Sequence, residues 1–264
     1  MAHIKSLRGG AQAHLLRCDD GNLYAVKFRN NPQGQRILAN EWLATAVSRY
    51  AGIETPDVTP IWIDEDFLRA TPEVSLRLGT RTLPVSPGYH LGSCYVGNGE
   101  REPYDYLPDT LLATVSNRRD FLGALVVDKF LANADARQCV FVREHGSFHV
   151  HMIDFGYAFN GPNWDFPDSD LAGIYCCARV YDTLSTTADL EPWLSRVEDM
   201  PRSVITDALE TLPPEWLAPE DHKLLPSLVR TAHSRQSSLR RTLTSLLSRR
   251  RATHFPAWQP TTAA

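Results

Sequence analysis

The sequence predicts an α+β fold with two lobes, a β-rich N-terminal lobe and a helical C-terminal lobe. Short β-type runs separated by turn residues fill the first third, and from about residue 117 apolar residues recur at helical spacing. The most polar groups of residues lie where a predicted helix meets a predicted hairpin in the second half. We therefore expect an N-terminal lobe over residues 1–103, a C-terminal lobe over 104–251 and a flexible tail over 252–264.

A β-hairpin is expected near the start of the N-terminal lobe. Two runs with strand character, His14–Cys18 and Leu23–Phe28, flank the turn sequence DDGN at residues 19–22. The Asp-Gly pair at its centre is a strong signal for a tight turn between antiparallel strands.

A helix and a further strand follow the hairpin. Apolar residues at helical spacing predict a helix over residues 35–50, which Gly52 ends, and Val58–Ile63 has strand character. Residues 64–103 are rich in Gly, Pro and Ser. We expect irregular structure there, with short strand-like pieces at Leu76–Leu78 and Cys94–Val96, forming an edge of a cleft.

The second half is predicted to be mainly helical around one hairpin. The almost wholly apolar stretch Phe121–Ala132 predicts a buried helix, and Cys139–Arg143 and His149–Ile153 predict two strands joined at residues 144–146. Beyond Pro192 the apolar pattern predicts further helices at Ser203–Leu212, Leu224–Ala232 and Leu239–Leu247.

Composition indicates a soluble globular protein of the cytoplasm. Apolar residues make up 43% of the chain and the net charge is −4, so nothing in the overall charge indicates nucleic acid or membrane binding. The five cysteines are odd in number and show no CxxC spacing, and there is no secretory signal, as in a reduced cytosolic protein. No segment approaches the roughly 18 apolar residues of a membrane span.

Three segments of the N-terminal lobe contain residues suited to binding phosphate. Lys27 lies in an apolar strand, YAVKF, where its side chain either points toward a cleft or faces solvent. Glu41 on the next helix is the obvious partner for an inward lysine, because an unpaired buried charge is costly. The segment GGAQ, with Gly10 and Gln12, precedes the hairpin and either forms a plain turn or lets backbone amides approach a phosphate.

Two carboxylates of the second half are candidates for phosphoryl transfer, which requires a proton acceptor and a ligand for metal ions. Asp135 lies on a short loop between the buried helix and the hairpin, together with Gln138, and either acts in chemistry or forms an Asx turn. Asp154 ends the second strand and is followed by Phe and Gly. A DFG tripeptide about twenty residues after an Asp-containing loop is moderately specific for kinases.

His149 and His151 permit a different interpretation. Residues two apart share one face of a strand, so these histidines and Asp154 could form a metal site. No third His or Cys stands nearby at ligand spacing, which favours packing or solvent contact instead.

Taken together, the motifs resemble the HipA-like kinase domain. The resemblance runs in order from about Leu7 to Trp164, through YAVKF, NPQGQRILANEW, FLANADARQCVFV, HMIDFGYAF and GPNW, with a looser match at PPEW (213–216). It implies a bilobal, protein-kinase-like fold that binds ATP and Mg²⁺. By the same resemblance Lys27 contacts the ATP phosphates, Glu41 orients it, Asp135 is the catalytic aspartate and Asp154 binds metal.

The chain departs from the family pattern in its catalytic loop and in its length. The wider family has an arginine directly after the aspartate and an asparagine five positions after it, where this chain has Ala136 and Val140. Valine offers no oxygen ligand for Mg²⁺, so Gln138 is predicted to serve as the second metal ligand, and Arg137 to replace the loop arginine. The toxin kinases of this family are longer, so their toxin activity, antitoxin partner and substrates are not carried over.

The sequence therefore predicts an ATP-dependent kinase that phosphorylates a hydroxyl of an acceptor, either a protein Ser/Thr or a small molecule. The alternative is a catalytically weak pseudokinase that binds nucleotide and acts as a regulatory module with a protein partner. A metal-dependent phosphohydrolase using Asp135, His151 and Asp154 is a further alternative.

Overall fold

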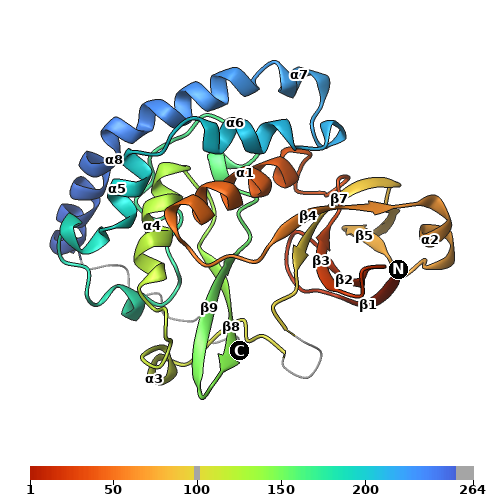
Figure 1. Ribbon diagram of the computed structural model, residues 1–264, viewed down its shortest axis with the longest axis horizontal. Helices are drawn as coiled ribbons and strands as arrows, with labels where there is room; N and C mark the ends of the chain where they lie inside the picture. The colour runs from red at the N-terminus through yellow and green to blue at the C-terminus, as the bar shows by residue number, and fades with distance from the viewer. Residues whose placement is uncertain (98–101, 254–264) are drawn as a thin grey trace.

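The chain folds into a sheet-containing lobe and a helical lobe, with one hairpin beside the junction (Figure 1). The structure, a computed structural model, describes residues 1–97 and 102–253. The main sheet of the described residues is antiparallel, and its strand order is β1 (Ala2–Ser6), β2 (His14–Arg17), β3 (Leu23–Lys27), β7 (Gly88–Cys94), β4 (Val58–Ile63). The α+β fold and the predicted hairpin at residues 14–28 are confirmed, since Arg17 pairs with Leu23 across the turn.

The expectation of mainly irregular structure over residues 64–103 is wrong, although the strand-like piece predicted at Leu76–Leu78 is confirmed as part of a strand. Of the piece predicted at Cys94–Val96, only Cys94 belongs to a strand. This region contains α2 (Glu65–Ala70), the hairpin strands β5 (Ser75–Leu78) and β6 (Arg81–Pro84), and β7, which lies inside the sheet between β3 and β4. The sequence conceals β7 because glycines interrupt its apolar pattern. A side chain at Gly92 would lie 2.5 Å from Cγ1 of Ile61 on β4, so the close packing of these two strands requires a glycine there.

The helical lobe includes one hairpin, formed by β8 (Gln138–Glu144) and β9 (Ser147–Ile153), which projects downward from the helices in Figure 1. The bounds of the helices are as follows: α3 Asp109–Leu112, α4 Asp120–Phe130, α5 Trp193–Glu198, α6 Ser203–Glu210, α7 Pro219–His222 and α8 Leu225–Thr253. Short 3₁₀ helices connect them at Ala158–Asn160, Ala178–Tyr181, Thr187–Leu190 and Pro214–Trp216. Among the described helices, none combines the length and the apolar character needed to cross a bilayer.

The two last predicted helices, Leu224–Ala232 and Leu239–Leu247, are parts of the single helix α8. The sequence HSRQSS between them lacks apolar residues, which suggested a break. In the structure Gln236 is buried in this stretch and donates hydrogen bonds to the carbonyls of Val197 and Met200. Tertiary contacts therefore stabilise the helix where the apolar pattern is interrupted.

The flexible tail expected over residues 252–264 begins within this helix, because α8 extends to Thr253. Residues 254–264 lie outside the described part of the chain.

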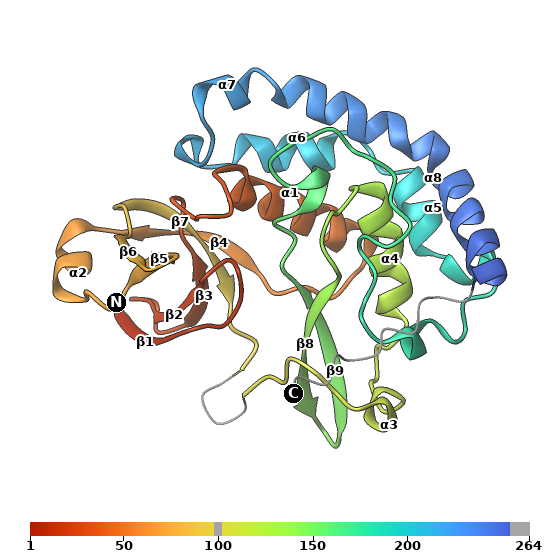
Figure 2. The same cartoon turned by 180° about the vertical axis from the view of Figure 1, so that it is seen from behind.

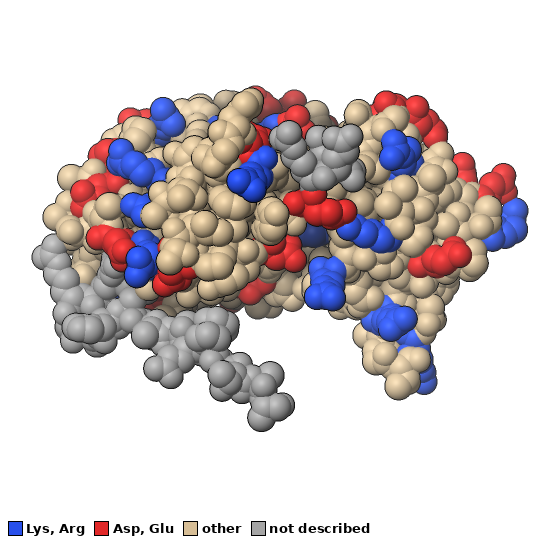
Figure 3. Space-filling view, turned by 90° about the horizontal axis from the view of Figure 1, so that it is seen from below, with Lys and Arg blue, Asp and Glu red and all other residues tan. Residues whose placement is uncertain are grey.

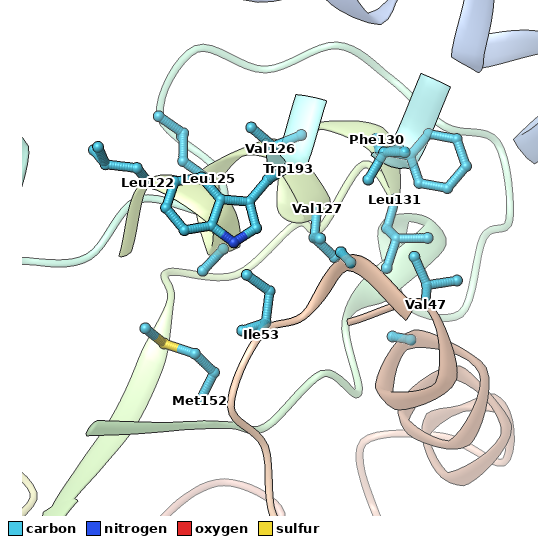
Figure 4. Packing of buried hydrophobic residues seen from close by; sticks show 14 of the residues in the cluster. Val47, Ile53, Leu122, Leu125, Val126, Val127, Phe130, Leu131, Met152 and Trp193 are labelled. Carbon is cyan, nitrogen blue, oxygen red and sulfur yellow. The ribbon is translucent and has the colours of Figure 1, made fainter. Parts of the chain in front are cut away.

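Helix α1 (Arg36–Ala51) joins the two lobes. It follows the N-terminal hairpin in sequence and ends at Gly52, which adopts the left-handed conformation as predicted. Its residues Leu43, Val47 and Ala51 nevertheless belong to the main core of the helical lobe, where Val47, Ile53 and Trp193 pack with the apolar side chains of α4 (Figure 4). The helix thus lies in the N-terminal region of the sequence but packs largely in the helical lobe, as Figure 2 also shows from behind.

Candidate active site

A cavity of about 400 Å³ lies between the sheet and the β8–β9 hairpin. Ala25 of β3 lines it from the sheet, Val140 and Ile153 from the hairpin, and residues 93–96 from the segment that leaves β7. Charged side chains at its edge are Lys5, Arg8, Glu102 and Asp105. The apolar surfaces on opposite sides and the polar edge are typical of a pocket for a flat ring with a charged extension.

Three charged residues meet beside this cavity. Lys27 lies on the same face of β3 as Ala25, about 7 Å further along the strand, because alternate residues of a strand share a face. Its ammonium group forms ion pairs with the carboxylates of Glu41 on α1 and Asp154 after β9, the latter at 2.9 Å. The inward orientation predicted for Lys27 and its pairing with Glu41 are thus present in the structure.

The ion pairs determine the charge of this group. Burial alone would lower the pKa of Lys27, but the carboxylates of Asp154 and Glu41 outweigh burial and raise it. Burial likewise opposes ionisation of Asp154, but the adjacent ammonium group of Lys27 lowers the pKa of this carboxyl below its usual range. Both Lys27 and Asp154 are therefore charged at neutral pH, with only 12% and 22% of their side chains exposed.

Asp135 is fixed on its loop by its own side chain and its carbonyl. One carboxylate oxygen accepts a hydrogen bond of 2.7 Å from the backbone amide of Ala136, and the other accepts one of 3.2 Å from the side-chain amide of Gln138. The Asp135 carbonyl accepts a hydrogen bond from the amide of Gly173. The Asx turn of this loop is made by Asn133, whose side-chain oxygen accepts a 3.2 Å hydrogen bond from the amide of Asp135, two residues later. The Asp135 side chain itself is half-exposed.

Arg137 connects this loop to the DFG segment. It donates hydrogen bonds to the carbonyls of Ile153 and Asp154, the latter at 2.8 Å, and its guanidinium group stacks on the ring of Phe155 at 4.1 Å. It also forms a 3.0 Å ion pair with Asp128 of α4, in which both side chains are fully or almost fully buried. Arg137 therefore positions the backbone around Asp154 and does not point toward a ligand.

Sequence reasoning missed Asp128 and its neighbour Lys129. Both are charged residues within an otherwise apolar helix, a signal that was visible in the sequence. Lys129 donates hydrogen bonds to three carbonyls of the segment after the DFG motif, those of Ser169, Asp170 and Ala172, and burial lowers its pKa to about 8. The pair on α4 thus holds the loops at both ends of the β8–β9 hairpin.

Gly10 and Gln12 do not reach the cavity. The side-chain nitrogen of Gln12 donates a 2.8 Å hydrogen bond to the carbonyl of Arg77 on β5, and its side-chain oxygen accepts one of 2.6 Å from the amide of Arg77. Gly10 lies against the side chain of Gln33. Leu7 and Arg8 of this loop line the cavity instead, and sequence reasoning did not select Arg8.

Val140, five residues after Asp135, presents an apolar side chain to the cavity. It lies on β8 opposite His151 and contributes to the apolar wall of the cavity beside Ile153. Gln138 is two residues earlier on the same face of the strand, opposite Ile153, which directly precedes Asp154. Gln138 is therefore the residue of β8 that lies nearest in register to Asp154.

The alternative of a histidine metal site is not supported. His149 contacts the hydroxyl of Ser116, and His151 lies 3.7 Å from the carboxylate of Glu54, on the outer part of the hairpin. Within residues 1–97 and 102–253, no group of three or more His, Cys, Asp or Glu side chains has an arrangement that would hold a metal ion.

Figure 3 shows lysine and arginine side chains interspersed with acidic ones over the face seen from below.

The comparisons with known proteins agree with this geometry. A family model described as HipA-like kinase matches residues 3–246, while no curated protein sequence matches the chain. Among solved structures, the chain is similar to HipA of Shewanella oneidensis MR-1, solved with HipB and operator DNA. The TM-score is 0.56 at 13% identity, over 92% of this chain and 67% of that one.

Two further structures share the fold. The Golgi casein kinase with bound Mn and ADP aligns with a TM-score of 0.54 and 12% identity, over 92% of this chain and 73% of the other. The proinflammatory kinase CtkA of Helicobacter pylori aligns with a TM-score of 0.52 and 15% identity, over 89% and 94% of the two chains. At these identities the similarity establishes a protein-kinase-like fold.

Proposed function

The chain belongs to the HipA-like kinase family, and from this premise we propose that it transfers the γ-phosphoryl group of ATP to a hydroxyl group of an acceptor. The observation that carries the proposal is the ion-paired group of Lys27, Glu41 and Asp154 at the side of a cavity between two lobes. Phosphoryl transfer depends mainly on positioning and on charge stabilisation, and these three residues supply fixed charges.

The nucleotide base would occupy the cavity. Ala25 on one side and Val140 and Ile153 on the other offer apolar surfaces for the two faces of a purine. Residues 93–96 line the same cavity and would lie along the edge of the ring. With the base there, the phosphates would extend along β3 toward Lys27, and Arg8 at the cavity edge would supply a second cation.

A magnesium ion would be bound by oxygen donors at the end of the β8–β9 hairpin where Gln138 pairs with Ile153. Asp154 would hold it through a carboxylate oxygen and Gln138 through its side-chain carbonyl, because Mg²⁺ prefers hard oxygen ligands. When bound, the ion would neutralise charge on the phosphates. The contact of Lys27 with Asp154 shows that the chain holds this cation and this carboxylate within reach of one ligand.

Asp135 would orient the acceptor hydroxyl and receive its proton. As the acceptor oxygen bonds to the γ-phosphorus, the bond from this phosphorus to the β–γ bridging oxygen breaks, and ADP leaves with the electron pair. The hydrogen bonds from Ala136 and Gln138 keep the Asp135 carboxylate in one orientation during the reaction.

We propose that the acceptor is a protein Ser/Thr or a small molecule. We also propose that the protein has a regulatory protein partner. All five cysteines are unpaired in the structure, which supports a cytoplasmic location. The pseudokinase remains the alternative, because Val140 in the cavity wall supplies no oxygen ligand at the position where the family pattern has an asparagine.

The test is ATP binding with and without Mg²⁺, measured by calorimetry on wild type and on Asp154→Ala, followed by ATP turnover. We expect binding that Mg²⁺ strengthens in wild type but not in Asp154→Ala, and ADP production that Asp135→Asn reduces at least a hundredfold. ATP binding without any turnover would favour the pseudokinase, and the absence of ATP binding would reject the proposal.

A further inference from the structure

The buried side chain of Asn40 lies directly before Glu41 and connects helix α1 to the DFG segment. Its amide nitrogen donates hydrogen bonds of 2.9 Å to the carbonyls of Gly156 and of Gly161. Its amide oxygen accepts a hydrogen bond of 2.7 Å from the indole nitrogen of Trp164. Asn40 is completely buried, and all three bonds go to the stretch that follows Asp154.

We propose that Asn40 is a positioning residue of the active site, which fixes the segment 154–164 against α1 and thereby sets the position of Asp154 relative to Glu41. The inference rests on the proposed function for its catalytic meaning. Asn40 touches neither nucleotide nor acceptor, and it acts through the backbone of the DFG segment.

The chemistry of the partners requires an asparagine at this position. An indole nitrogen can only donate a hydrogen bond and a carbonyl can only accept one. The side chain at position 40 must therefore present one acceptor and two donor hydrogens from a single planar group. An aspartate has the same shape but would face two carbonyl oxygens with an oxygen that has no proton, and a leucine would leave all three partners without a bond.

The backbone that Asn40 holds needs external support. Asp154, Phe159, Asn160 and Trp164 all have φ between 58° and 63°, in the left-handed region that residues other than glycine rarely occupy. Such conformations persist where surrounding structure determines them. Four of them within eleven residues indicate that contacts made to the segment, and not its own preferences, maintain its path.

Helix α1 is a firm base for this support. The indole nitrogen of Trp42 donates a 2.9 Å hydrogen bond to the carbonyl of Ala208 on α6. The guanidinium group of Arg36 bonds to Asp221 on α7 and lies 4.3 Å over the ring of Trp164. Glu41 and Asp154 are therefore held in one framework with the helical lobe, and Lys27 approaches them from the sheet.

The first test uses hydrogen–deuterium exchange of the protein without nucleotide, for wild type and Asn40→Asp. We expect exchange of the amides of residues 154–164 to become at least tenfold faster, with β4 and α8 unchanged. Trp164→Phe, which keeps the ring but removes the donor to Asn40, should show a smaller change in the same segment and covers the case in which Asn40→Asp does not fold. Unchanged exchange in the segment, or faster exchange spread evenly over the protein, would overturn the proposal.

The second test separates positioning from general stability. The ratio of ATP affinities with and without Mg²⁺ should fall about tenfold in Asn40→Asp, while affinity without Mg²⁺ stays within twofold of wild type. Asn117→Ala is the matched control, because Asn117 also bonds through its side chain to a distant backbone, at Val150, but lies outside the site. A similar fall in Asn117→Ala would reduce Asn40 to a structural role. If wild type binds no ATP, the proposed function fails, whereas the exchange experiment still decides whether Asn40 fixes the segment.

Discussion

The ammonium nitrogen of Lys27 lies 2.9 Å from a carboxylate oxygen of Asp154, although 127 positions separate the two residues in the sequence. This contact joins the sheet to the segment that follows β9, beside the cavity that Ala25 and Ile153 line. Glu41 on α1 completes the group, so each of three structural units contributes one charge. The geometry leads to four predictions.

Removing the charge of Lys27 should affect stability and activity in separable ways. Lys27→Met leaves Glu41 buried without its cation, so we expect unfolding to become easier by about 3–5 kcal/mol, measured by urea denaturation. The double variant Lys27→Met with Glu41→Gln should recover most of this loss. Neither variant should bind ATP with wild-type affinity. A double variant as active as wild type would show that Lys27 has no role in the reaction.

Val140 and Gln138 should affect different properties of the site. Val140→Phe fills the cavity and should weaken ATP binding by at least tenfold with or without Mg²⁺, since a larger ring occupies the place of the base. Gln138→Ala should leave ATP binding without Mg²⁺ unchanged but require several times more Mg²⁺ for half-maximal turnover. If the Gln138→Ala variant retains the wild-type Mg²⁺ requirement, the side chain of Gln138 is not a metal ligand.

Arg137→Lys should be strongly destabilising although it keeps the charge. Lysine cannot reproduce the planar fork that reaches Asp128 and the carbonyls of Ile153 and Asp154 together. We expect a loss of about 2–4 kcal/mol in the free energy of unfolding, because buried partners remain unpaired. Arg81→Lys, at an exposed position on β6, serves as control and should change stability by less than about 0.5 kcal/mol.

The stability of the N-terminal lobe should fall at mildly acidic pH because of His90. This ring is completely buried, accepts a hydrogen bond from the amide of Arg29 and donates one to the carbonyl of Ser86, and burial lowers its pKa to about 4. The unfolded chain protonates this histidine below its ordinary pKa of 6.5, whereas the folded chain does so only near 4. Stability due to His90 is thus complete above pH 6.5 and is lost as the pH falls toward 4.

Between pH 7.5 and pH 5 this loss should amount to about 2 kcal/mol, measured by urea unfolding at both values. The control is His90→Asn, which retains an acceptor for Arg29 but does not titrate, and which should lose correspondingly less stability over the same interval. An identical pH dependence of the two proteins would show that His90 does not titrate as argued. His14 is also buried with a lowered pKa, and its contribution remains in both proteins.

Several elements could be predicted because their signals are local. The turn at residues 19–22, the helix ended by Gly52 and the strand at Val58–Ile63 follow from adjacent residues, and all three are present. The same holds for the buried helix α4 and the hairpin that separates Asp135 from Asp154. Strand β7 and the continuity of α8 could not be predicted, because Gly92 and Gln236 owe their places to Ile61 and to the carbonyls of α5 and its C-terminal loop.

The sequence alone determined the family pattern and the ion-paired group, since Lys27, Glu41 and Asp154 were identified from motif order and residue type and meet in the structure. The catalytic role of Asp135 stays a prediction. The tertiary structure decided which neighbouring residues take part. Gln12 bonds to the backbone of β5, and Val140 lines the cavity wall. Arg137 bonds to the carbonyl of Asp154, and Asn40 bonds to the carbonyls of Gly156 and Gly161. The physical reason is that the role of a polar side chain depends on its hydrogen-bond partners, and these can be distant in sequence. Asp154 is 127 residues from Lys27, and Gly156 and Gly161 are 116 and 121 residues from Asn40.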